Sequence, residues 1–174
     1  MTLNIISILL FQEAYHTTLR LLKDYIYYQT ELGIIYCGDV MEILPLLDAN
    51  SVDMSITSPP YWRCRRYTDS SKELGQEPTI QEYLQNLWNI YIEVYRVTKE
   101  VGSAWVNLGD RYYHKVSGTG GKGSKQDTNV GSRFVCDKPV VQELPEGALC
   151  QIPTKFSNGM PYFSLKNQVI WHKP

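Results

Sequence analysis

Two consecutive prolines, Pro59 and Pro60, constrain the fold of this chain more than any other feature of its sequence. The apolar run before them, residues 52–57, predicts a strand. Proline has no backbone donor and holds φ near about −65°, so a strand cannot continue through the pair. We therefore predict that the chain leaves a sheet after residue 57 as a stiff loop, Ser58-Pro59-Pro60-Tyr61.

The segments around this loop alternate between helical and extended patterns. Thr79 is a plausible helix N-cap with Glu82 as its capping-box partner, and an apolar stripe then continues for about four turns. Further helices are predicted over 14–29 and 40–47, and further strands over 34–37, 103–108 and 167–172. This alternation is typical of an α/β domain with a largely parallel sheet.

Two segments fit this pattern less well. Residues 3–11 are mostly apolar, but they lack a basic region before them and a small-residue cleavage site after them. They are also too short to cross a membrane, so we expect a buried helix or strand, a cytoplasmic protein and no membrane partner. Residues 115–150 are rich in glycine and polar side chains, which predicts a flexible insertion or a binding loop.

Charge and cysteine usage narrow the function classes. The net charge is −1, so no global field attracts nucleic acid. Between residues 111 and 138, however, six basic side chains stand against two acidic ones. The four cysteines are far apart and form no Cys-x-x-Cys pair, which argues against a zinc site and against a disulfide framework.

The loop after residue 57 carries the residues with the clearest chemistry. A hydroxyl, Ser58, precedes the prolines and an aromatic ring, Tyr61, follows them. In open α/β sheets, ligands bind at the carboxyl ends of strands. Outward-facing carbonyls and a hydroxyl would accept hydrogen bonds from an NH₂ group on a flat ring. Such bonds would draw the amine nitrogen toward tetrahedral geometry and so make its lone pair available for attack.

Residues 57–62 resemble motif IV of the amino-methyltransferases, (Ser/Asp/Asn)-Pro-Pro-(Tyr/Phe), in its serine form. Other blocks look like the same family in its order and spacing over roughly residues 34–174. The order of these blocks resembles the class of the family in which the catalytic half precedes the cofactor-binding half. A serine at position 58 resembles the enzymes that methylate cytosine at N4, and methylation of adenine at N6 is the alternative. These further blocks are Gly38-Asp39, Ser51-Val52-Asp53, Leu74 to Glu77, Ser103 to Asp110 and Val169 to Pro174.

The resemblance implies a DNA methyltransferase, typical of restriction–modification systems, that uses S-adenosylmethionine and acts on double-stranded DNA with a flipped base. Ser58 and Pro59 would bind the target amine, Tyr61 would stack on the base, and Asp39 would approach the cofactor adenine. Six basic side chains either contact DNA phosphates or form a solvated basic surface, and we expect the DNA contact. These residues are Arg63, Arg65, Arg66, Lys115, Lys122 and Lys125.

The glycine-rich cofactor loop of the resembled family, Phe-x-Gly-x-Gly, is absent from the sequence. We therefore expect a partial Rossmann-like methyltransferase sheet with flanking helices that lacks the strands of the cofactor-binding half. Residues 1–33 would be a helical extension and residues 34–174 the catalytic portion. The missing half would come from a longer natural product or from a second polypeptide. The open alternatives are a non-catalytic DNA-binding or assembly subunit, and an enzyme acting on RNA or on a protein glutamine amide.

Overall fold

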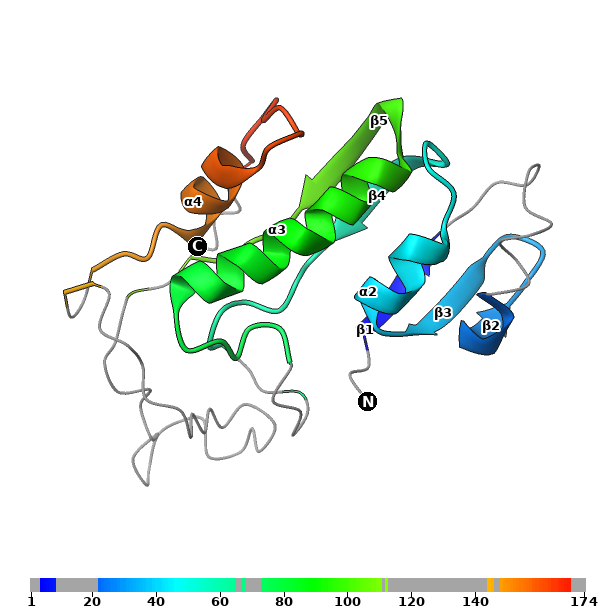
Figure 1. Cartoon of the computed structure of the whole chain (residues 1–174), viewed down its shortest axis with the longest axis horizontal. Coiled ribbons are helices and arrows are strands. Elements are labelled where there is room, and N and C mark those ends of the chain that lie inside the picture. Colours follow the sequence, from blue (N-terminus) through cyan, green and yellow to red (C-terminus); the bar gives the residue numbers. More distant parts are fainter. Residues whose placement is uncertain are drawn as a thin grey trace.

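The computed structural model describes residues 4–8, 22–64, 67, 73–110, 112, 144–145 and 148–169. In this part of the chain the strands form two separate sheets (Figure 1). The first is antiparallel, in the order β1 (Asn4–Ile8), β3 (Ile34–Gly38) and β2 (Ile26–Gln29). The second is a parallel pair, β4 (Val52–Thr57) and β5 (Thr98–Val106), which contains the predicted strand over 52–57.

Helix α3 (Ile80–Val97) connects the two parallel strands and packs against them. It begins where predicted, because the Thr79 side chain accepts a hydrogen bond from the Glu82 backbone N–H at 3.1 Å. Its apolar stripe is buried, as the spacing predicted. The buried residues of α3 are Ile80, Tyr83, Leu84, Leu87, Tyr91, Val94 and Val97.

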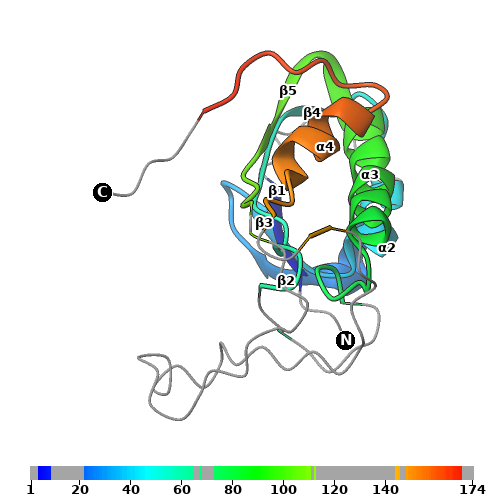
Figure 2. The same ribbon diagram turned by 90° about the vertical axis from the view of Figure 1, so that its left-hand side faces the viewer.

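A second helix on the same side of the pair, α4 (Ile152–Gly159), was not predicted (Figure 2). It packs on α3, where Trp88 Nε1 donates to the Phe156 carbonyl at 3.1 Å. The rings of Tyr91 and Phe156 meet edge to face, with centroids 5.0 Å apart. At eight residues α4 is too short for a clear periodic signal, so its position depends on this packing.

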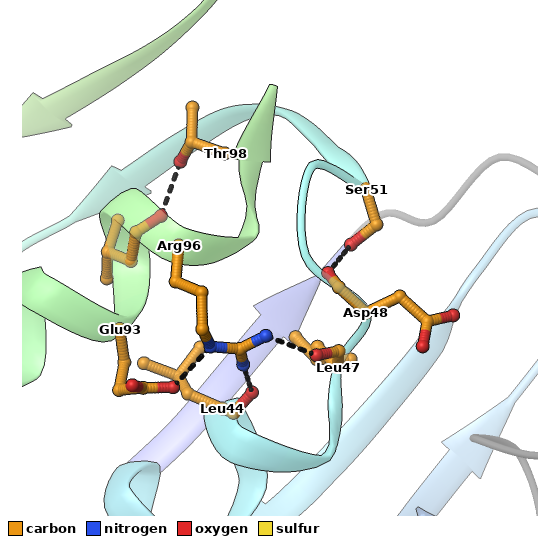
Figure 3. A network of polar contacts seen from close by, with 8 residues as sticks. Leu44, Leu47, Asp48, Ser51, Glu93, Arg96 and Thr98 are labelled. Atoms are coloured by element: carbon orange, nitrogen blue, oxygen red, sulfur yellow. Dashed lines mark hydrogen bonds and ion pairs between the residues drawn. The ribbon is translucent and has the colours of Figure 1, made fainter. Parts of the chain in front are cut away.

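The crossover from β3 to β4 contains a short helix, α2 (Val40–Ile43), followed by the 3-10 turn η2 (Leu44–Leu46). Arg96 at the end of α3 holds this crossover (Figure 3). Its guanidinium donates to the carbonyls of Leu44 and Leu47 at 2.8 and 2.9 Å, and pairs with the Glu93 carboxylate at 2.8 Å. One side chain therefore joins the crossover to the parallel pair.

The predicted helix over 14–29 is wrong at its carboxyl end. Residues 23–25 form the 3-10 turn η1 (Lys23–Tyr25), and residues 26–29 form β2, which pairs antiparallel with β3. The apolar spacing there reflects contact with a neighbouring strand rather than one face of a helix. Residues 14–21 lie outside the described part of the chain.

The prediction of a single, largely parallel sheet also needs correction. Among the described residues, β4 and β5 are the one pair of strands that is parallel, and β3 does not pair with β4. The strand predicted over 103–108 begins earlier, at Thr98, and ends at Val106. Residues 167–169, the described part of the strand predicted over 167–172, form no strand. Most of the predicted insertion 115–150 lies outside the described ranges.

The two faces of the parallel pair differ in cover. The face of the pair that carries the Thr57 side chain lies against the helices, because Thr57 is hydrogen-bonded to Tyr91 of α3. The opposite face carries three apolar side chains that are more than half exposed, Met54, Ile56 and Trp105, and Ile56 and Trp105 are register partners. None of the helices in the described ranges is long and apolar enough to cross a membrane.

Candidate active site

The loop Ser58-Pro59-Pro60-Tyr61 leaves the sheet at the carboxyl end of β4, as predicted. Beyond the last ladder pair, the Asn107 N–H donates to the Thr57 carbonyl at 2.9 Å. Because β4 and β5 are parallel, the ends of both strands meet at one edge. Ser58 is exposed and Tyr61 is half-buried, so both can meet a ligand at this edge.

Two buried tyrosines of α3 hold the loop from behind. The Tyr83 hydroxyl donates to the Pro60 carbonyl at 2.8 Å, and the Tyr91 hydroxyl is hydrogen-bonded to Thr57 Oγ1. Burial raises the pKa of Tyr83 and raises the pKa of Tyr91 to about 12. Both hydroxyls therefore stay protonated near neutral pH and can donate.

This arrangement divides the acceptors of the loop into two sets. The Pro60 carbonyl is engaged by Tyr83, which fixes the second proline. Within the described residues no donor contacts the Ser58 hydroxyl or the Pro59 carbonyl. These two acceptors are the ones that the sequence predicted for the target amine.

The Tyr61 ring is oriented by two residues from the end of β5. Its hydroxyl donates to Asn107 Oδ1 at 3.3 Å. A Cβ on Gly109 would lie 2.7 Å from the Tyr61 atoms Cδ2 and Cε2, so the glycine backbone lies directly against the ring. Sequence reasoning placed Asn107 and Gly109 in a family-like block without giving either a role. Their position at a strand end beside the loop was the signal that could have identified them.

The chain after Tyr61 turns inward. Trp62 is 2% exposed and its Nε1 donates to the Glu77 carbonyl at 3.0 Å. Arg63 is 5% exposed, has a left-handed backbone with φ of 51°, and its guanidinium lies 5.9 Å from the Trp62 ring centroid. The predicted phosphate contact of Arg63 is therefore corrected, because this side chain packs inside the protein and not at its surface.

Asp39 lies at the carboxyl end of β3 and caps α2. One carboxylate oxygen accepts from the Met41 N–H at 2.9 Å. The structure describes no hydrogen bond between Asp39 and the Ser58 loop, and the two belong to different sheets. The remaining residues predicted to contact DNA lie outside the described ranges; they are Arg65, Arg66, Lys115, Lys122 and Lys125.

These residues fit a target amine better than they fit a nucleoside cofactor. The acceptors at Ser58 and Pro59 suit two N–H donors, and Tyr61 offers a flat ring. For a cofactor, the only predicted contact is the Asp39 carboxylate, and one of its oxygens already serves the α2 N-terminus. In the described part of the chain, the residues brought together at the end of β4 therefore suit an amine on a flat ring, and Asp39 lies apart from them.

Comparison with known proteins agrees with this chemistry. The family profile described as DNA methylase matches residues 52–174. The Type II methyltransferase M.SfiI of Streptomyces fimbriatus is 42% identical over 142 residues, which are 80% of this chain and 30% of that protein. M.SmaI of Serratia marcescens is 31% identical over the same share of this chain and 47% of its own length.

The chain thus spans less than half of the length of these relatives. No solved structure matches it. The profile match covers well over half of the chain and includes the whole Ser58 loop, the helix α3 and both parallel strands. The chain therefore belongs to the DNA methylase family of N6 and N4 amino-methyltransferases, which use S-adenosylmethionine as methyl donor.

Proposed function

We propose that this chain carries the target-amine side of a DNA amino-methyltransferase that acts on cytosine N4. The observation that carries the proposal is the pair of acceptors at Ser58 and Pro59, at the open end of a parallel strand and next to the oriented Tyr61 ring. A flipped base would stack on Tyr61 with its amine toward the two acceptors. The relatives are named Type II methyltransferases, which supports a role in restriction–modification.

The residues of the loop would act by orientation and electrostatics. The amine lone pair of cytosine is delocalised into the ring and is a poor nucleophile. Hydrogen bonds from both amine protons to Ser58 Oγ and the Pro59 carbonyl would localise that lone pair and aim it. Tyr83 would hold the loop in position against the bound base, because its hydroxyl is hydrogen-bonded to the neighbouring carbonyl of Pro60. When bound, S-adenosylmethionine supplies an electrophilic methyl group, and the methylated nitrogen gives up one proton to water.

The donor side of the site is proposed to lie on a complementary half, either in a longer natural product or in a second polypeptide. The relatives contain more than twice the length that the chain matches, which leaves room for such a half. Parallel strands are normally covered on both faces. The open face with Met54, Ile56 and Trp105 is the surface that apolar helices of the complementary half would cover. DNA phosphate contacts are proposed for Arg65, Arg66, Lys115, Lys122 and Lys125.

Methyl transfer from labelled S-adenosylmethionine to DNA tests the proposal. The protein is the full product of the natural locus, with any polypeptide that purifies with it. Ser58→Ala removes one acceptor, and we expect the rate to fall by at least tenfold. Ser157→Ala is the matched control, because within the described ranges that hydroxyl donates to the Thr154 carbonyl of its own helix α4 and contacts no residue of the loop. Equal rates for Ser58→Ala and the control would contradict the assigned role of Ser58.

A further inference from the structure

Glu77 is a buried carboxylate close to the catalytic loop, and the proposed chemistry does not use it. Glu77 is only 8% exposed. Two donors converge on it: the Gly75 N–H reaches Oε2 at 2.8 Å and Asn86 Nδ2 reaches Oε1 at 2.9 Å. Burial raises the pKa of Glu77, so keeping this carboxylate inside the protein has a cost. A carboxylate that is buried at a cost and is hydrogen-bonded on both oxygens is expected to have a structural or functional role.

The partners of Glu77 lead directly to the loop. Gly75, which Glu77 fixes through its N–H, accepts the Arg63 N–H at 2.6 Å. A Cβ on Gly75 would lie 3.1 Å from the Tyr61 carbonyl and 3.3 Å from Pro60 Cβ, so the segment is pressed against the loop. The positive φ of Gly75, 91°, makes this close approach possible.

A second set of contacts joins the same elements. The backbone carbonyl of Glu77 accepts the Trp62 indole N–H, one residue after Tyr61. Asn86 lies on α3 one turn after Tyr83, whose hydroxyl holds the Pro60 carbonyl. The loop is thus enclosed between α3 and residues 73–77, and the Glu77 carboxylate joins these two sides.

We propose that Glu77 is a positioning residue for methyl transfer: its carboxylate locks residues 73–77 to α3 and thereby fixes Pro60 and Tyr61. The inference rests on the proposed function of the loop. A carboxylate suits the position because it offers two acceptor oxygens to two donors, whereas glutamine offers only one. The hydrogen bonds of the Glu77 carboxylate to Gly75 and Asn86 carry this effect. None of these three residues touches the target base.

Amide hydrogen exchange on the 174-residue chain tests the lock without any need for activity. In Glu77→Ala, we expect the Arg63 and Gly75 amides to exchange at least tenfold faster than in the unsubstituted chain. The Asn107 amide at the end of β5 reports on the sheet and should change by less than twofold. Glu77→Gln should fall between the two, since it keeps one acceptor. Glu100→Gln, at an exposed carboxylate of β5, is the matched control.

Uniform acceleration across the chain would mean general destabilisation and would overturn the proposal, as would unchanged exchange at Arg63 and Gly75. If Glu77→Ala does not fold, Glu77→Gln carries the test with the same two criteria.

Methylation separates this inference from the proposed function. In the active enzyme, Glu77→Ala should lower kcat at least tenfold and leave the KM for DNA within twofold, because the lock orients the loop and does not bind DNA. If Glu77→Ala loses exchange protection in the 174-residue chain but the full product of the natural locus transfers no methyl group to DNA, the proposed function is refuted and the lock stands. Normal methylation by a variant with a released loop would refute the positioning role.

Discussion

Replacing Gly109 with alanine should displace the Tyr61 ring. The new Cβ would lie 2.7 Å from two ring carbons and 3.2 Å from Cζ, whereas ordinary contacts begin at about 3.5 Å. The ring must therefore move by close to 1 Å, and its bond to Asn107, already 3.3 Å long, would be lost. Stacking of a base on an aromatic ring is worth about 1–3 kcal/mol. We expect kcat/KM for DNA methylation to fall roughly five- to a hundredfold.

A double-mutant cycle shows whether this effect passes through Tyr61. Gly109→Ala, Tyr61→Ala and the double variant are compared in the methyl-transfer assay with the full product of the natural locus. If Gly109→Ala acts by moving the ring, it should cost little once the ring is gone, so the two effects should not add. Additive losses would refute the reasoning, because Gly109 would then act independently of Tyr61.

Three further predictions concern the packing. Arg96→Ala should lower the free energy of unfolding by about 2 kcal/mol in a denaturant titration, because two carbonyls of the crossover lose a charged donor; an unchanged midpoint would contradict this. Because burial raises the pKa of Glu77, its contribution to stability is fully present below its unfolded value of 4.5 and is lost as the pH rises through the folded value. The unfolding free energy of the unsubstituted chain, relative to Glu77→Gln, should therefore fall as the pH rises above 4.5, and a pH-independent difference would speak against it. Ile56→Lys, at a side chain 72% exposed, should change the stability of the isolated chain by less than about 0.5 kcal/mol but lower the activity of an enzyme whose complementary half covers that face.

Local chemistry made part of this fold predictable. The proline pair fixed the end of β4, and the Thr79 cap with its apolar stripe fixed α3, because both signals act within a few residues. Ile26 and its neighbours show the limit. Their spacing suits a helix, but pairing with β3 makes them a strand, and such pairing has no local signature.

The same limit applies to the candidate site. The position of Ser58, Pro59 and Tyr61 at the end of β4 was predictable because they lie in one contiguous motif, while their roles toward a target base stay predictions. For Arg63, a place next to the catalytic loop suggested a phosphate contact, yet the structure buries this side chain to 5% exposure, and no local pattern in the sequence indicated that burial. Glu77 lies in one of the family-like blocks, but its proposed role depends on a hydrogen bond from Asn86 of α3. The spacing of residues along the chain does not predict that contact.

The most direct test of the central claim is the chemical identity of the methylated base. DNA treated with the active enzyme and S-adenosylmethionine is digested to nucleosides, which are then separated and weighed by mass spectrometry. The account predicts N4-methylcytosine, which disappears in Ser58→Ala and persists in Ser157→Ala. N6-methyladenine would keep the amine chemistry but overturn the assignment to cytosine. A methyl group on a ring carbon would contradict the account, because Ser58 and Pro59 would then hold no target amine.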